Sequence, residues 1–375
     1  MPQISGRGLI LPNDYFKPGP RGFDGQMQDY INSGTVIAKY IVLEPKLSAR
    51  TADQYNPSDY FSDRLIKSLA NGSISIIFDC SLEGARLSYP YYERFRDDFV
   101  RNSFPLDNFY YLTCDANERS YYNNVDNIYH INLVDTLVTP PTTVVERQKD
   151  HLFSCLNRKP RYWRSRMIFE LCKKHQNHML CSHPKINSVG DFNNSTGVPV
   201  IEQDMVDFLI KNTPMQASTS NPLTDGMLND NYMDALPEVY SRVCFDLAME
   251  TDHDPGYETL SEKTFKPMMN MLPVIIWGVP GINTTALTRL GFRTYEDWFD
   301  LSFDSEPNTE KRMKLLIAEI DRVCAELCSA SDLTAWQNKN VQVLEHNRTT
   351  LLNGLSTNIF ELSRLYKNLE NLTYK

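Results

Sequence analysis

Short apolar runs alternate with helical stretches along two parts of this 375-residue chain. The run at residues 73–79 is almost continuously apolar, which is typical of a parallel strand buried on both faces. A stretch with helical periodicity precedes it at residues 59–70, and a second one follows at residues 89–102. This alternation predicts an α/β fold with parallel sheets and right-handed crossover connections.

The expected elements form two groups, which are separated by a Pro- and Thr-rich linker at residues 136–150. Strands are expected at residues 36–42, 73–79, 109–113, 127–134, 152–156, 243–249 and 274–278. Helices are expected at residues 59–70, 89–102, 165–174, 262–271 and 310–328, and residues 332–372 also have a helical pattern. The polar residues 185–235 predict a loop-rich insertion in the second group.

The length of the chain favours more than one domain, because single hydrophobic cores stop growing at roughly 250–300 residues. Apolar residues make up 41% of the sequence, which is enough for two cores and argues against disorder. We predict a first lobe at residues 1–140, a second lobe at residues 151–330 and terminal helices at residues 331–375 that pack across both lobes.

Charge and cysteine content limit the possible partners and compartments. The net charge of −9 repels nucleic acid and anionic membranes, so a polyanion would need a local basic patch. The eight cysteines form no CxxC pair and predict free thiols in a reducing compartment. No apolar segment is long enough to span a bilayer, and we recognise no secretory signal. We therefore expect a cytoplasmic protein without membrane contact.

Residues 250–281 contain the residue types of a phosphate site. Ser261 is a good N-cap for the helix that follows, and a helix N-terminus offers free N–H groups and partial positive charge to an anion. Lys263 and Lys266 add cationic donors, and the carboxylate of Glu262 can accept hydrogen bonds from both hydroxyls of a ribose. A capped helix whose charges face solvent is the alternative interpretation.

A basic segment at residues 157–166 follows one expected strand and precedes an expected helix. It holds five cations within nine residues. Arginine makes bidentate contacts with phosphate, so we predict that Arg158 binds a diphosphate and that Arg161 or Arg164 assists. Two aromatic residues interleave with these cations, which leaves a nucleic-acid surface or a solvated loop as alternatives.

A third candidate site follows the buried strand at residues 73–79. The carboxyl ends of parallel strands line the ligand crevice in open α/β sheets. A carboxylate at this edge could act as the general base that deprotonates an acceptor hydroxyl. Glu83 is the first candidate for this base and Asp79 the second. A loop that only caps the next helix explains the same residues.

Two further patterns predict no metal site. Zinc-like residue types occur at Cys172, His175, His178, Cys181 and His183, but their spacing does not fit a zinc finger. Residues 252–254 imitate the Asp-x-Asp motif of metal-dependent transferases and are interpreted as a loop. No dinucleotide fingerprint, Walker A motif or nucleophile elbow is present.

Residues 250–281 resemble the donor-binding motif of GT-B glycosyltransferases, in particular that of the α-1,3-fucosyltransferase family. The matching positions are Glu250, Tyr257, Ser261, Glu262, Lys263, Pro273, Gly278 and Pro280. The chain also resembles glycosyltransferase-like proteins of large tailed phages, in the segments 261–267 and 290–294. Thr251 departs from the fucosyltransferase pattern, which has Asn at that position. The resemblance covers roughly residues 151–325.

This resemblance implies a GT-B-like fold of two Rossmann-like lobes with C-terminal helices. It implies that Glu262 binds the donor ribose and Lys263 the diphosphate, with Arg158, Arg161, Arg164, Glu250, Tyr257, Ser261 and Lys266 completing the donor site. The implied reaction is inverting transfer of a sugar from a nucleotide diphosphate sugar to an acceptor hydroxyl, with no metal or other cofactor.

The acceptor stays open at this point. It is expected to be a glycan or, for a phage enzyme in its host's cytoplasm, a hydroxymethylated DNA base. The basic residues at positions 64, 67, 94, 96 and 101 favour DNA, and the acidic net charge speaks against it. A binding module that kept the nucleotide-sugar fold but lost its chemistry is a further alternative.

Overall fold

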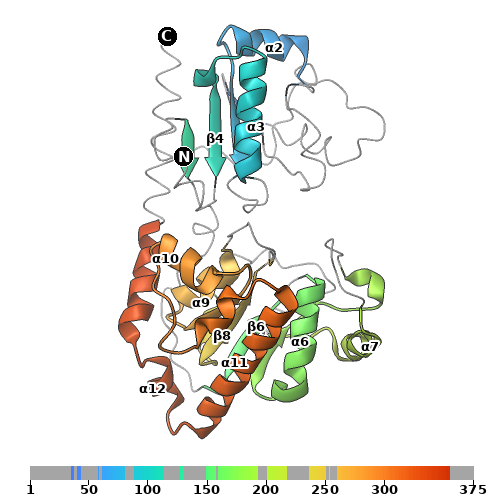
Figure 1. Ribbon diagram of the computed structural model, residues 1–375, viewed down its shortest axis with the longest axis vertical. Coiled ribbons are helices and arrows are strands. Elements are labelled where there is room, and N and C mark those ends of the chain that lie inside the picture. Colours follow the sequence, from blue (N-terminus) through green and yellow to red (C-terminus); the bar gives the residue numbers. More distant parts are fainter. Residues whose placement is uncertain are drawn as a thin grey trace. The chain divides into compact units, whose positions relative to one another are not determined.

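The chain divides into two compact units, residues 1–133 with 355–375 and residues 134–354, and each is described by itself. The computed structural model describes residues 35–37, 40–43, 58, 61–80, 88–113, 127–130, 149–157, 159–192, 201–217, 236–250, 253 and 260–354. Figure 1 shows both units, with some of their helices and strands labelled.

The first unit contains a five-stranded sheet in the order β1-β2-β3-β4-β5. Strands β2 to β5 are parallel, and β1 pairs antiparallel with β2 at one edge. The strands are β1 (Thr35–Ile37), β2 (Tyr40–Leu43), β3 (Ser75–Cys80), β4 (Phe109–Thr113) and β5 (Ile128–His130). The helices are α2 (Asp63–Ala70), α3 (Ser88–Arg101) and the short 3-10 helix η4 (Leu106–Asn108).

Aromatic side chains fill the core of the first unit. Phe78 of β3 lies with its ring centroid 4.5 Å from that of Phe95 and 6.2 Å from that of Phe99, both on α3. Phe109 of β4 completes the cluster at 5.4 Å from Phe78. Such aromatic pairs stabilise a core beyond the area that they bury. They fasten α3 to the sheet as the predicted β–α–β alternation requires.

The predicted strand at residues 36–42 is wrong in one respect. The structure has two short strands there, in which Ile37 pairs antiparallel with Tyr40. The intervening Ala38 and Lys39 give no sequence signal for a tight connection, because hairpin turns are usually marked by Gly, Asn or Asp. An apolar run without these residues therefore looks like one continuous strand.

The second unit contains a four-stranded parallel sheet in the order β7-β6-β8-β9. Its strands are β6 (Phe153–Leu156), β7 (Met179–Ser182), β8 (Phe245–Met249) and β9 (Val274–Trp277). The chain moves outward from β6 to β7 on one side, and outward from β8 to β9 on the other side. The strand order therefore reverses between β6 and β8, and ligands of open α/β sheets bind beyond the carboxyl ends of the strands at such a reversal.

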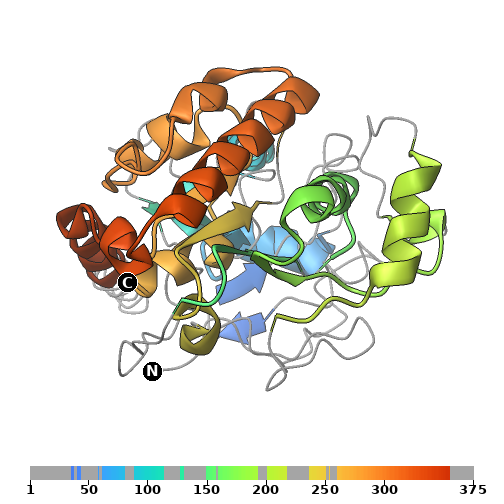
Figure 2. The same ribbon diagram turned by 90° about the horizontal axis from the view of Figure 1, so that it is seen from below.

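Helices flank this second sheet. Figure 2 shows α6 between α11 and α7, and α6 packs against both of them. The helices are α6 (Tyr162–His175), α7 (Gln203–Asn212), α8 (Pro237–Tyr240), α9 (Glu262–Met269), α10 (Leu287–Arg289), α11 (Thr309–Ser329) and α12 (Leu333–Gln337), with further helical residues at 341–354. Shorter helical turns are η5 (Val189–Asp191), η7 (Ile282–Ala286) and η8 (Leu301–Ser305). No helix in these described ranges is long and apolar enough to cross a membrane.

The core of the second unit extends into the residues that follow α11. Every side chain of β8 and β9 is buried, which explains the nearly continuous apolar runs that predicted these strands. Trp336 of α12 belongs to the same buried cluster, as do Leu344 and Leu351 of the helical residues 341–354. Burying side chains of this size contributes roughly 1.5–3 kcal/mol each. The described residues 331–354 therefore pack within the second unit.

One helix lies inside the predicted loop-rich insertion at residues 185–235. Helix α7 (Gln203–Asn212) buries Met205, Val206 and Leu209. These three apolar residues are separated by polar ones, and the averaged composition of the segment hides their helical spacing. The predicted loop-rich insertion therefore contains a helix that the sequence analysis did not expect.

Candidate anion-binding site

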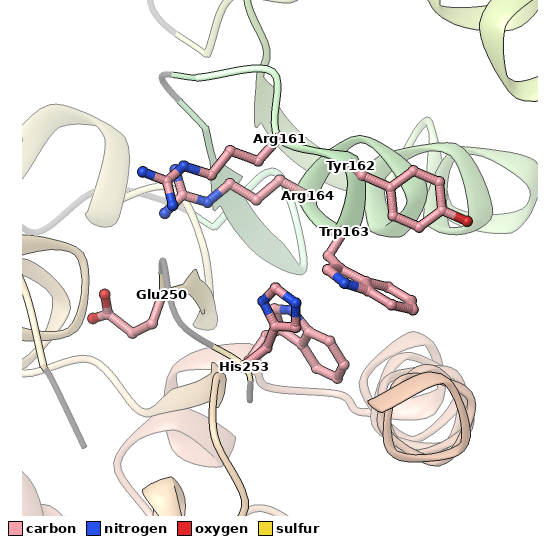
Figure 3. A pocket seen from close by; sticks show the side chains of 7 residues that line it. Arg161, Tyr162, Trp163, Arg164, Glu250 and His253 are labelled. Carbon is pink, nitrogen blue, oxygen red and sulfur yellow. The ribbon is translucent and has the colours of Figure 1, made fainter. Parts of the chain in front are cut away.

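A pocket lies where the strand order of the second sheet reverses. The empty space at this pocket, open solvent included, is about 280 Å³. Its lining consists of Arg161, Tyr162, Trp163, Arg164, Glu250, His253 and Trp277 (Figure 3). The first four residues follow β6 and begin α6, two more follow β8, and Trp277 ends β9. Three neighbouring strands therefore contribute to one pocket at their carboxyl ends.

Two arginines form the cationic side of this pocket. Figure 3 shows the side chains of Arg161 and Arg164 running in the same direction, with their guanidinium groups next to each other. Arg164 is only 3% exposed. Burial and, as a smaller cause, the charge of Arg161 lower its pKa to about 10, whereas Glu250 and Glu262 oppose the shift. Two cations held together in a poorly solvated place favour the binding of an anion between or beside them.

The position of this arginine pair adds to the positive potential. Arg161 immediately precedes α6, and Arg164 lies in the first turn of that helix. The N-terminus of a helix carries unpaired N–H groups and a partial positive charge. Helix α6 has 14 residues, so the partial charge at its N-terminus adds to the positive charge of these two arginines.

Glu250 holds the beginning of the neighbouring helix α9. One carboxylate oxygen accepts hydrogen bonds from the backbone nitrogen of Ser261 at 2.8 Å and from the hydroxyl of Thr264 at 2.7 Å. The other oxygen accepts a hydrogen bond from the Ser261 hydroxyl at 2.6 Å. Glu250 is only 3% exposed, so these bonds replace its hydration. This carboxylate therefore occupies the position at the N-terminus of α9 where an anionic ligand would otherwise bind.

Glu262 and Lys263 interact with each other at the start of α9. The Lys263 ammonium donates to Oε1 of Glu262 at 3.0 Å and to the Ser261 hydroxyl at 2.9 Å. Burial alone would raise the pKa of Glu262, but the charges of Lys263 and Lys266 outweigh it and lower the pKa. Glu262 is thus held as a carboxylate, with its side chain 17% exposed. Its negative charge also acts on Arg164.

The other side of the pocket is aromatic. The Trp163 ring lies with its centroid 5.6 Å from that of His253 and 6.3 Å from that of Trp277. Tyr162 and Trp163 extend away from the arginine pair in Figure 3. All four side chains are buried to more than nine-tenths of their surface. A ligand at this pocket meets charge on one side and ring edges or faces on the other.

The two sequence segments that predicted a phosphate site meet in this pocket. Arg161 and Arg164 come from the basic segment, and Glu250 comes from the segment that precedes α9. Glu262 and Lys263 lie at the adjoining helix start, whereas Lys266 is one turn further along α9 and 7% exposed. The predicted donor-binding roles of these residues stay predictions.

Several predicted residues lie outside the described part of the chain. Arg158, Tyr257 and Glu83 belong to this group. Asp79 is in β3 of the first unit, one residue before its end, but only its backbone is described. The general base that the sequence analysis assigned to Glu83 or Asp79 therefore has no described side chain.

Two of the histidines among the residues with zinc-like side chains have other partners. The Nε2 atom of His183 lies 2.9 Å from the hydroxyl of Ser165, and its Nδ1 atom lies 2.9 Å from the carbonyl oxygen of Pro184. Since a neutral imidazole has one donor and one acceptor, Nδ1 donates to Pro184 and Nε2 accepts from Ser165. Nε2 of His175 bonds to Asp321 at 2.7 Å. His183 thus ties the end of β7 to the first turn of α6, next to Arg164.

Sequence reasoning missed the aromatic side of the pocket. Trp277 is the last residue of a strand, which is a signal for a binding site in a parallel sheet. His253 lies in the segment that was interpreted as a loop. Trp163 was noticed only as a possible nucleic-acid contact. None of these positions carries a residue type that indicates a charged ligand.

No protein-family model matches this chain, and no curated protein sequence matches it significantly. A solved α1,3-fucosyltransferase crystal structure is similar at 10% sequence identity and a TM-score of 0.30, over 77% of this chain and 75% of that one. A TM-score of this size does not establish a common fold and says nothing about what the chain binds.

Proposed function

We propose that this chain is a glycosyltransferase that uses a nucleoside diphosphate sugar and binds the donor's phosphates at the pocket of the second unit. The observation that carries the proposal is the position of Arg161 and Arg164. They lie side by side at the strand-order reversal of a parallel sheet, in one pocket with Glu250. This is the place and the charge that a diphosphate requires.

The proposed roles follow from the charges around the pocket. The arginines bind the diphosphate, and they stabilise the negative charge that grows on it when the glycosidic bond breaks. Arg158, Lys263 and Lys266 supply further positive charge, and Glu262 accepts hydrogen bonds from the ribose hydroxyls. Glu250 and Ser261 fix the start of α9 and thereby the direction of Glu262 and Lys263.

The acceptor half of the reaction rests on the sequence resemblance. In this part of the proposal Glu83 or Asp79 takes the proton from an acceptor hydroxyl, whose oxygen then attacks the anomeric carbon with inversion. The cations near the diphosphate make a metal ion unnecessary in this scheme. Tyr257 is assigned to the donor on the same basis.

A glycan or small hydroxyl acceptor has better support than DNA. On α3, Arg96 lies within 3.7 Å of Glu93 and 3.9 Å of Asp97, and Arg101 lies 3.7 Å from Asp98. These carboxylates reduce the positive potential that a duplex would need. The described part of this surface therefore carries both positive and negative side chains.

The proposal is tested by exposing the full chain to UDP, GDP, ADP and CMP sugars and measuring the release of free nucleotide. A transferase is expected to hydrolyse its donor slowly without an acceptor, and one nucleoside diphosphate sugar should stand out. Arg164→Ala should abolish this release. Lys173→Ala is the control, since Lys173 lies on the same helix but contacts Glu170 and the Phe169 ring outside the pocket. Binding without release would favour the non-catalytic module, and no binding of any nucleotide would contradict the proposal.

A further inference from the structure

A buried arginine of α11 joins the two loops that follow β8 and β9. Arg312 is 1% exposed. Its Nη2 atom donates to the carbonyl oxygens of His253 at 2.6 Å and of Gly278 at 3.1 Å. Its Nη1 atom donates to the carbonyl oxygens of Glu306 at 2.6 Å and of Pro307 at 3.4 Å. One guanidinium group therefore holds three separate backbone segments.

Two of these segments carry side chains of the pocket. His253 lines it directly, and Gly278 follows Trp277, which also lines it. The guanidinium carbon of Arg312 lies 5.2 Å from the centre of the Trp277 ring, within the range of a cation–π contact. Arg312 thus fixes both the backbone and one ring of the aromatic side of the pocket, although it does not line the pocket itself.

A side chain that served only the core would not need to be charged. Burying a guanidinium costs free energy that hydrogen bonds to carbonyl oxygens offset. The apolar residues of α11, among them Leu316 and Ile320, already provide the packing against the core. Arginine is suited to hold several carbonyl oxygens at once because its donors form a rigid planar fork, which lysine lacks.

We propose that Arg312 is a positioning residue that sets the affinity of the pocket for the donor's diphosphate. It does so by holding the loops at His253 and Gly278 at the distance from Arg161 and Arg164 that the diphosphate requires. The identity of the ligand rests on the function proposed above. The role of Arg312 rests on its own contacts.

The experiment measures binding of inorganic pyrophosphate, UDP and GDP to full-length variants by calorimetry, at a temperature where each variant is folded. Arg312→Lys keeps the charge but loses the fork, and we expect it to bind pyrophosphate about tenfold more weakly or worse. Arg322→Met is the control on the same helix, since Arg322 pairs with Glu319 and Glu326 and is expected to keep the wild-type affinity. Added methylguanidinium should restore part of the affinity in Arg312→Ala and change nothing in Arg322→Met.

The outcomes separate this inference from the proposed function. Wild-type affinity in Arg312→Lys, together with a lower melting temperature, would show a role in stability alone and overturn the inference. Absence of binding by the wild-type protein would overturn the proposed function, and the inference with it. If the variants do not fold, amide hydrogen exchange of the wild-type protein with and without pyrophosphate tests the inference instead. Pyrophosphate should slow exchange at residues 306–312, outside the pocket, and unchanged exchange there would contradict the inference.

Discussion

The carboxylate of Glu250 accepts two hydrogen bonds from Ser261, one from the backbone nitrogen at 2.8 Å and one from the hydroxyl at 2.6 Å. A protein carboxylate therefore already meets the N-terminus of α9. The cations that line the pocket are Arg161 and Arg164, at the beginning of α6. In the proposed function these two arginines bind the diphosphate, and α9 contributes Glu262 and Lys263.

Replacing Glu250 should destabilise the second unit. Glu250→Ala removes three hydrogen bonds to a buried carboxylate and leaves the Ser261 and Thr264 hydroxyls without that acceptor. We expect the free energy of unfolding to fall by roughly 2–4 kcal/mol, measured by denaturant titration. Glu345→Ala, at an exposed position, should change it by less than about 0.5 kcal/mol. Equal stability of the two variants would show that the cap is unimportant.

Asp246 should make the second unit less stable as the pH rises. This residue lies in β8, is 2% exposed and accepts a hydrogen bond from Ser154 on β6. Burial raises the pKa of Asp246 from 3.8 to about 7, against the lowering effect of the Ser154 hydroxyl. The folded chain therefore binds more protons than the unfolded chain between those values, so stability is full below pH 4 and is lost as the pH rises towards 7.

Asp246→Asn removes this titration and keeps an oxygen that can accept from Ser154. We expect the variant's melting temperature to fall less than that of the wild-type protein between pH 4.5 and 7.5. Circular dichroism at a series of pH values measures the difference. Asp204→Asn on the exposed side of α7 serves as the control and should keep the wild-type slope. An identical slope in Asp246→Asn would mean that this carboxyl does not titrate in that range.

His183 should have the opposite effect. Burial lowers the pKa of His183 from 6.5 to about 4, the nearby Arg164 lowers it as well, and the Pro184 carbonyl opposes the shift. The unfolded chain therefore binds more protons between those values, so this contribution to stability is present above pH 6.5 and is lost as the pH falls to 4.

His183→Gln removes this titration while keeping an acceptor for Ser165. The variant should lose less stability than the wild-type protein between pH 6.5 and 4.5, measured with the same melting series. Since Asp246 and His183 act in opposite directions over this range, the double variant should have a slope close to that of the wild-type protein. A steeper loss of stability towards pH 4.5 in His183→Gln would contradict the assignment.

Part of the buried fold could be predicted from the sequence, whereas the strand β7 was not among the expected elements. The limits of β4, β8, β9 and α11 agree with the apolar pattern to within two residues, since their burial depends on the residues of the element itself. The break between β1 and β2 could not be predicted, because Ala38 and Lys39 give no turn signal. Helix α7 could not be predicted either, because its few apolar residues lie within a segment of polar composition.

The site could be predicted where it depends on residue type. Arg161 and Arg164 could be predicted as candidates for a phosphate site, because they are arginines between a strand and a helix and in the first turn of that helix. Glu250 and Ser261 are 11 positions apart in the sequence, and the contacts of Arg312 are with backbone carbonyl oxygens. Backbone acceptors occur at every residue, so no pattern of side chains reveals them.

Calorimetric titration of UDP, GDP and pyrophosphate into the wild-type chain and the Arg161→Ala/Arg164→Ala double variant addresses the anion site itself. The wild-type protein should bind at least one nucleoside diphosphate, with an affinity that falls as salt is added. The double variant should bind it at least about a hundredfold more weakly, while Lys173→Ala keeps the wild-type affinity. Equal affinity of the wild-type protein and the double variant would contradict a diphosphate site at this pocket.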